Sequence, residues 1–217
     1  MKRYLIVFLA VLFAFGIASA RKKDKAGRIE NGVYNDNVYG FSMVIPDEWD
    51  SSIKKEEDPI RLILTKKQYD IPTQFQYAPN YTKAPKVTVL VDTTSMKLDW
   101  FVDSLLNDKY GSKQKKKILQ NLEILYGDYV PKKNSKVSFG STEGILISGE
   151  RRYTIQVQRA GYESDKADVV TDYFGGSVFF AKKGNQLIMI HFICEKRYFS
   201  TLDQVFMKLL NGFTLTK

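Results

Sequence analysis

The strongest hydrophobic pattern lies near the C-terminal end, where residues 187–193 (Leu-Ile-Met-Ile-His-Phe-Ile) are apolar at nearly every position. Successive side chains of a β-strand point to opposite faces of the sheet, so this segment predicts a central strand covered on both faces. Lys183-Gly184-Asn185 precedes it and predicts a hairpin turn, with a glycine available for positive φ. Ser177–Lys182 is the expected other arm of that hairpin.

Two segments repeat hydrophobic residues at the i, i+3, i+4, i+7 and i+8 spacing of an amphipathic helix. They run from Leu98 to Leu106 and from Leu202 to Leu210. Ser200-Thr201-Leu202-Asp203 fits a capping box at the start of the second helix, and Gly212 is its predicted end. A further helix is predicted between Ser112 and Gly127, with lysines concentrated in its first turns.

Shorter apolar or alternating runs predict the remaining strands. They lie at residues 41–45, 60–65, 87–91, 153–157 and 213–215. Because the strands are joined by hairpins, and the helices are inserted between groups of strands, we expect an α+β fold built on an antiparallel sheet. Lys66–Lys86 resembles neither element; it contains three prolines and is predicted to be a long loop rich in aromatic residues.

The first twenty residues have the three parts of a secretory signal in order. Lys2 and Arg3 are positive, Tyr4 to Phe15 are apolar, and small residues up to Ala20 fit a cleavage site. We expect residues 1–20 to be a signal peptide, residues 21–32 a flexible basic tail and residues 33–217 a single domain. An uncleaved N-terminal anchor is the alternative. The predicted location is periplasmic or extracellular, with no transmembrane span after cleavage.

The composition excludes several classes of functional site. The 217 residues include 33 Lys and Arg against 24 Asp and Glu, but only one Cys and one His. These counts exclude a disulfide scaffold, a cysteine-based zinc site and any relay that needs two imidazoles. Cys194 and His191 lie in or next to the apolar segment at 187–193, so we expect both to be buried. We expect no cofactor and no metal.

One motif resembles a known family. Tyr39-Gly40-Phe41-Ser42-Met43-Val44-Ile45-Pro46-Asp47-Glu48-Trp49 is similar to the opening of PsbP-like domains, in which an aromatic-Gly-Phe lead enters an apolar strand that closes on Pro and then Trp. The resemblance implies a central antiparallel sheet flanked by helices on both faces, an α/β/α sandwich, with the motif residues serving as framework. The family includes photosystem II subunits, exported bacterial proteins and a Ran-binding nuclear import factor, so it implies no single function.

Two local features are candidates for modification or ion binding. Glu163–Asp172 gathers four carboxylates but lacks the spacing and the turn glycine of a calcium loop, so we interpret it as a solvated loop. Asn80-Tyr81-Thr82 is a glycosylation sequon.

No catalytic constellation emerges, so we predict a non-enzymatic binding or accessory domain of the cell envelope. Its expected partner is an envelope protein or an anionic surface, and not nucleic acid. The predicted contact residues are the loop aromatics and the lysines of the second helix: Tyr69, Phe75, Tyr77, Tyr81, Lys113, Lys115, Lys116 and Lys117. The alternative is a small-ligand or metal-dependent enzyme that uses scattered carboxylates such as Glu143 and Glu150.

Overall fold

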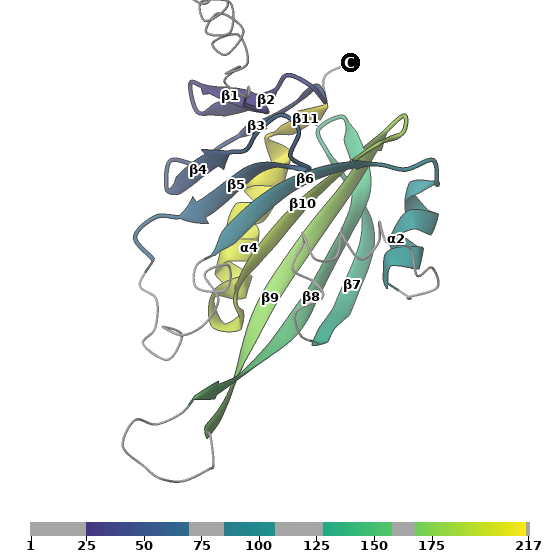
Figure 1. Ribbon diagram of the computed structural model, residues 1–217. Coiled ribbons are helices and arrows are strands. Elements are labelled where there is room, and N and C mark those ends of the chain that lie inside the picture. The colour runs from purple at the N-terminus through teal and green to yellow at the C-terminus, as the bar shows by residue number, and fades with distance from the viewer. Residues whose placement is uncertain (1–24, 70–84, 107–127, 158–167, 216–217) are drawn as a thin grey trace, which may run out of the picture.

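A computed structural model describes residues 25–69, 85–106, 128–157 and 168–215 (Figure 1). The first antiparallel sheet has the strand order β1 (Gly27–Glu30), β2 (Val33–Asp36), β3 (Phe41–Val44) and β11 (Phe213–Leu215). The second has the order β4 (Trp49–Ile53), β5 (Ile60–Lys66), β6 (Lys86–Thr93), β10 (Gln186–Glu195), β9 (Asp168–Lys183), β8 (Thr142–Val157) and β7 (Asp128–Phe139). The described helices are α2 (Leu98–Leu106) and α4 (Lys196–Asn211).

The predicted α+β fold, a sheet flanked by helices on both faces, is wrong. The described chain is mostly strand, in sheets of four and seven strands, and its helices have only 9 and 16 residues. The strands β8 and β9 are much longer than the predicted runs at 153–157 and 177–182, and β7 is a strand that the sequence pattern does not predict. The region predicted as a solvated loop contributes to this length, because Asp168–Asp172 belong to β9. The helix predicted between Ser112 and Gly127 falls outside the described residues.

The central strand is confirmed. β10 is the fourth of seven strands, pairs with β6 and β9, and is buried along nearly its whole length. Its side chains alternate between two cores, with Ile190 and Phe192 in one and Leu187 and Met189 in the other. The first core joins the seven-stranded sheet to α4 and the four-stranded sheet, and the second joins it to α2. Figure 1 shows α4 crossing one face of the large sheet, and the second core places α2 against β8 and β9.

Two hairpin turns use the backbone freedom of glycine. The β9–β10 hairpin turns at Gly184, whose φ is +57°, as predicted. The β1–β2 hairpin turns at Asn31-Gly32, where both residues have positive φ, a combination that matches the right-handed twist of paired strands. We had expected the folded domain to begin near Val33, but β1 precedes that residue.

Helix α4 begins one turn earlier than the capping-box pattern predicted. Glu195 occupies the N-cap position, so Ser200 lies inside the helix. Asp203 does not complete a capping box, because its carboxylate accepts a hydrogen bond from Ser177 Oγ of β9 at 2.8 Å. The predicted end is confirmed, since Gly212 follows the helix and β11 then pairs with β3.

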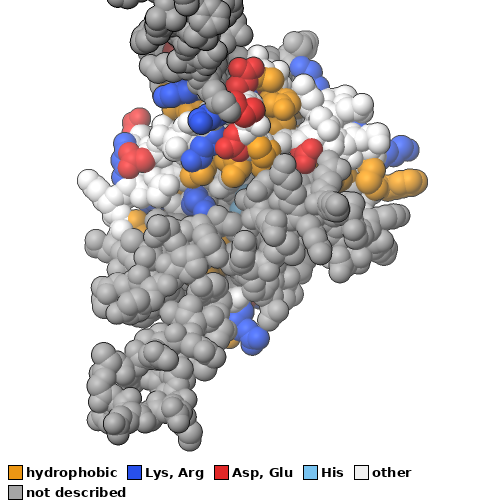
Figure 2. Space-filling view, viewed as in Figure 1, with side chains coloured by type: hydrophobic (Ala, Val, Ile, Leu, Met, Phe, Trp, Pro, Cys, Tyr) orange, Lys and Arg blue, Asp and Glu red, His pale blue; other side chains and the backbone are white. Residues whose placement is uncertain are grey.

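Charged side chains of both signs share the described surface. In the space-filling view of Figure 2, Lys and Arg side chains lie beside Asp and Glu side chains instead of gathering in one basic area. The net charge of +9 is therefore not concentrated in a single patch on the described part of this face.

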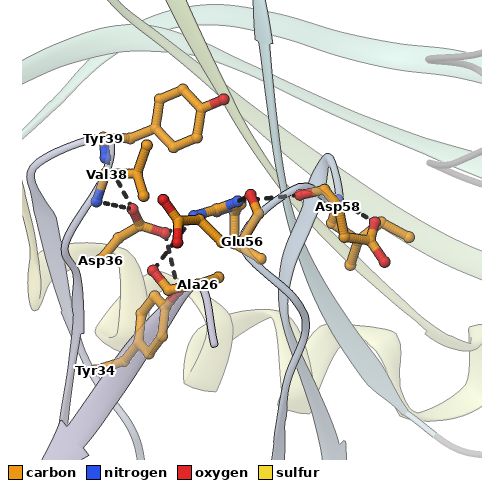
Figure 3. A network of polar contacts seen from close by, with 9 residues as sticks. Ala26, Tyr34, Asp36, Val38, Tyr39, Glu56 and Asp58 are labelled. Atoms are coloured by element: carbon orange, nitrogen blue, oxygen red, sulfur yellow. Dashed lines mark hydrogen bonds and ion pairs between the residues drawn. The ribbon is translucent and has the colours of Figure 1, made fainter. Parts of the chain in front are cut away.

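A buried polar network joins the two sheets (Figure 3). Arg61 of β5 donates from Nε to Asp36 Oδ2 of β2 at 2.9 Å, and both side chains are fully buried. Asp36 also accepts from the Tyr34 hydroxyl at 2.9 Å and from the amides of Val38 and Tyr39. Burial, followed by the interaction with Asp36, raises the pKa of the Tyr34 phenol.

The other donors of Arg61 are satisfied by the main chain. Nη1 donates to the carbonyls of Glu56 and Asp58, and Nη2 donates to the carbonyl of Ala26 at 3.3 Å. The guanidinium carbon also lies 4.8 Å from the centroid of the Tyr39 ring, the first residue of the family-like motif. Because the partners of Arg61 span both sheets, we interpret this network as structural and not as a ligand site.

Candidate functional site

The structure describes one of the eight predicted contact residues. Tyr69 follows β5 and is half-buried. The other seven predicted contact residues lie outside the described residues: Phe75, Tyr77, Tyr81, Lys113, Lys115, Lys116 and Lys117. The same holds for Asn80 and for residues 1–24. Tyr69 is therefore the starting point for a site that the structure can define.

Tyr69 contacts the junction between β10 and α4. Its hydroxyl donates to Glu195 Oε1 at 2.7 Å, across 126 positions of sequence. Its ring meets the Tyr198 ring edge to face, with centroids 5.9 Å apart. Burial, and then the hydrogen bond to Glu195, raise the pKa of the Tyr69 phenol. These contacts attach the end of β5 to the first turn of α4.

Glu195 organises this junction. It ends β10, occupies the N-cap position of α4 without a side-chain capping bond, and has a buried carboxylate. Its second oxygen accepts from Arg197 Nε at 2.7 Å. The Arg197 guanidinium carbon lies 4.7 Å from the centroid of the Tyr198 ring, a cation–π geometry. A negative charge at this position also suits the N-terminal end of the helix dipole.

A second group of charges also includes a residue from the first turn of α4. Glu150 of β8 pairs with Lys132 Nζ at 2.7 Å and with Lys196 Nζ at 3.1 Å. Hydrogen bonds from these two lysines lower the pKa of the Glu150 carboxyl. The ammonium of Lys196 also lies 5.6 Å from the centroid of the Tyr173 ring. Lys196 therefore links the start of α4 to both β8 and β9.

Together these side chains form what we call the aromatic–cation surface: Tyr69, Tyr173, Tyr198, Lys132, Lys196 and Arg197. Tyr173 and Tyr198 are 47% and 40% exposed, and they are two of the five large hydrophobic residues exposed in the described chain. Each of these two tyrosines has a cation over its ring. Exposed tyrosines beside an arginine are typical of surfaces that bind a partner.

Sequence reasoning identified Tyr69 but missed the rest of this surface. Lys196-Arg197-Tyr198 precedes the predicted capping box at Ser200, and no element is predicted for these three residues. The signal that could have identified it is a pair of adjacent cations followed by an aromatic residue, directly after a buried strand. Lys132, Glu150 and Tyr173 come from three other strand positions, and only the pairing of β7, β8 and β9 brings them near α4.

The carboxylates named for the alternative enzyme do not share a site. Glu143 and Glu150 lie on the same strand, β8, seven positions apart. An odd separation places their side chains on opposite faces of the sheet, about 23 Å apart along the strand. Glu150 is held by two lysines, as described above. These two residues therefore cannot act on one substrate from this arrangement.

The single His and single Cys are buried, as predicted. His191 and Cys194 both lie on β10, and burial raises the pKa of the Cys194 thiol, which keeps it protonated. Among the residues that the structure describes, no group of three His, Cys, Asp or Glu side chains could hold a metal ion. In the same residues, no helix combines the length and the apolar character needed to cross a membrane.

No protein-family model and no curated protein matches this sequence. Solved structures do match this chain, among them the following three. Cyanobacterial PsbP (CyanoP) from Synechocystis sp. PCC 6803 is 11% identical with a TM-score of 0.48, covering 91% of this chain and 98% of its own. LpqN of Mycobacterium tuberculosis, involved in cell envelope biogenesis, is 12% identical with a TM-score of 0.48, covering 89% and 90%. The Ran-binding protein Mog1p of Saccharomyces cerevisiae is 11% identical with a TM-score of 0.46, covering 87% and 96%. Membership of the PsbP-like family stays a prediction from the opening motif.

Proposed function

We propose that this protein is an exported, non-enzymatic binding or accessory domain of the cell envelope. The observation that carries the proposal is the aromatic–cation surface at the start of α4. There Tyr173 and Tyr198 stay exposed, two of the five large hydrophobic side chains that are exposed in the described part of the chain. Burying an exposed tyrosine ring against a partner is favourable in free energy. Tyrosine also contributes a disproportionate share of the binding energy at the centres of interfaces.

The residues predicted from sequence remain part of this proposal. Tyr69 belongs to the aromatic–cation surface, and Phe75, Tyr77 and Tyr81 follow it in the same connection between β5 and β6. The lysines at 113, 115, 116 and 117 are proposed as a second contact region. The amino-acid pattern of residues 1–20 supports export, since its positive start, apolar stretch and small residues fit a secretory signal.

Export and binding are tested separately. For export, cells producing the full chain with a C-terminal tag are fractionated, and the N-terminus of the exported product is determined by mass spectrometry. The expected product begins at Arg21. A product that stays inside the cell would exclude the envelope location.

For binding, the tagged protein is used to capture partners from envelope extracts. Three variants are compared with the wild type: Tyr198→Ala, deletion of residues 70–84, and Glu at all four lysine positions from 113 to 117. Each is first shown to unfold at the wild-type temperature. Loss of a captured protein in any variant supports the proposal, and identical capture by the wild type and all three variants contradicts these contact regions.

A further inference from the structure

We infer that the aromatic–cation surface binds an acidic segment of a protein partner. Lys196 and Arg197 would hold carboxylates of that segment, while Tyr173 and Tyr198 would cover its apolar side chains. This inference rests on the proposed binding function and adds the chemistry of the partner to it.

The cations of this surface are more exposed to solvent than the carboxylates, and this difference determines which charge a partner contacts first. The side chains of Glu195 and Glu150 are 6% and 26% exposed, whereas those of Arg197 and Lys196 are 52% and 50% exposed. The carboxylates therefore lie beneath the cations. A partner that approaches from solvent meets positive charge and tyrosine rings first, and the complementary partner is acidic.

Arg197 is held in position before any partner arrives. Its Nε is bonded to the buried Glu195 carboxylate, and the Tyr198 ring packs against its guanidinium. The guanidinium also carries two Nη groups, a planar fork that matches the two oxygens of a carboxylate. Because the side chain is already restrained, binding to it loses less conformational entropy than binding to a free arginine.

The same observations favour a protein over a lipid surface. Segments that attract anionic membranes contain clusters of about four to eight Lys and Arg. Here the surface as defined has three cations, fewer than such a cluster contains. Tyrosine and arginine together are instead enriched at the centres of protein interfaces. A segment that alternates acidic and apolar side chains satisfies both components of this surface.

The test uses three probes with the full-length mature protein. The first is a fluorescein-labelled synthetic peptide in which Glu alternates with Leu, and the second has Lys in place of Glu. The third is a vesicle of phosphatidylglycerol and phosphatidylcholine. Peptide binding is measured by fluorescence anisotropy and vesicle binding by co-sedimentation. We expect binding of the Glu peptide only.

Three variants and a matched control locate the binding. K196Q and R197Q remove one charge each, and Y198A removes an aromatic ring without changing the charge. We expect each to weaken binding of the Glu peptide about tenfold. The control K208Q removes one exposed charge from the last turn of the same helix, and its affinity should equal that of the wild type. Thermal unfolding verifies that all four variants fold.

The outcomes separate this inference from the proposed function. Equal weakening by K196Q and K208Q, or binding of vesicles alone, overturns the acidic protein segment as ligand. Failure of the Glu peptide to bind also overturns it, while capture from envelope extracts that still depends on Tyr198 leaves the proposed function intact. Capture that is unchanged in Tyr198→Ala and in the other two variants would contradict the contact regions of the proposed function.

Discussion

Arg61 and Asp36 form a fully buried ion pair that connects the seven-stranded sheet to the four-stranded sheet, with Nε and Oδ2 2.9 Å apart. Buried charges are stable only when they are paired and their remaining donors and acceptors are satisfied. Here the main chain at Ala26, Glu56 and Asp58 satisfies the other donors of Arg61. The pair therefore fixes how the two sheets pack.

Removing one partner of this pair should be severely destabilising. We expect Asp36→Asn and Arg61→Met each to lower the free energy of unfolding by about 3–5 kcal/mol, because the remaining charge stays buried without its partner. The matched control is Arg28→Ala, which breaks the exposed pair with Glu30 and should cost less than about 1 kcal/mol. Urea denaturation measures all three. Similar costs for the buried and the exposed pair would show that the network does not hold the sheets together.

Gly175 should be required for the close packing of α4 on β9. A Cβ atom at this position would lie 2.2 Å from Cγ of Phe199, so Gly175→Ala forces the ring to move. We expect a loss of about 1–3 kcal/mol in the free energy of unfolding. In a Phe199→Ala background the same substitution should cost much less, and a double-mutant cycle measures this coupling. If the two substitutions lower the free energy of unfolding additively, the cost of Gly175→Ala does not come from a clash with Phe199.

The two features above illustrate what sequence could and could not predict. The amphipathic helices α2 and α4 and the strand β10, which is apolar on both faces, were predictable because each depends on the periodicity of neighbouring residues. Arg61 and Asp36 are 25 positions apart and on different sheets, so no local pattern relates them. The early start of α4 was also not predictable from local sequence. Phe199, in the first turns of the helix, packs over Gly175 of β9, and this contact is long-range.

The site was predictable to the same extent. Tyr69 could be singled out because aromatic residues cluster in a proline-rich connection. Its partners Glu195 and Tyr198 could not, because the hydrogen bond to Glu195 spans 126 positions. The prediction of the fold class was wrong because the lengths of β7, β8 and β9 depend on pairing between strands. Short windows of sequence carry no information about that pairing.

Tyr69→Phe should destabilise the junction at the start of α4. The substitution removes the only donor that Tyr69 offers to the buried Glu195 carboxylate, and we expect a cost of about 1–3 kcal/mol in the free energy of unfolding. Tyr198→Phe is the control, since its described contacts involve the ring; its expected change is below about 0.5 kcal/mol. Chemical denaturation of both variants decides between them. Equal costs would argue against a structural role for the Tyr69 hydroxyl.

Glu150 should make stability dependent on acid pH. The lysines at 132 and 196 lower its pKa in the folded protein below the ordinary value of 4.5. The unfolded chain therefore binds more protons in this range, so the stabilisation is complete above that value and is lost as the pH falls through the folded pKa. We expect the stability difference between wild type and Glu150→Gln to shrink as the pH falls below 4.5. Urea midpoints across this range measure it.

A second comparison isolates the cause of that pH dependence. In a Lys132→Gln/Lys196→Gln background, Glu150→Gln should change stability by the same small amount at every pH, because the hydrogen bonds that lower the pKa are gone. A stability difference that keeps its pH dependence in this background would assign the effect to other groups.

The central claim is that a partner docks on the aromatic–cation surface. The most direct measurement is photo-crosslinking in cells that produce the protein natively, with a photoreactive phenylalanine analogue at position 198 or, as control, at position 208 on the last turn of the same helix. The predicted result is a discrete crosslinked protein from position 198 and none from position 208. Absence of a crosslink at position 198, or the same products from both positions, would contradict the claim.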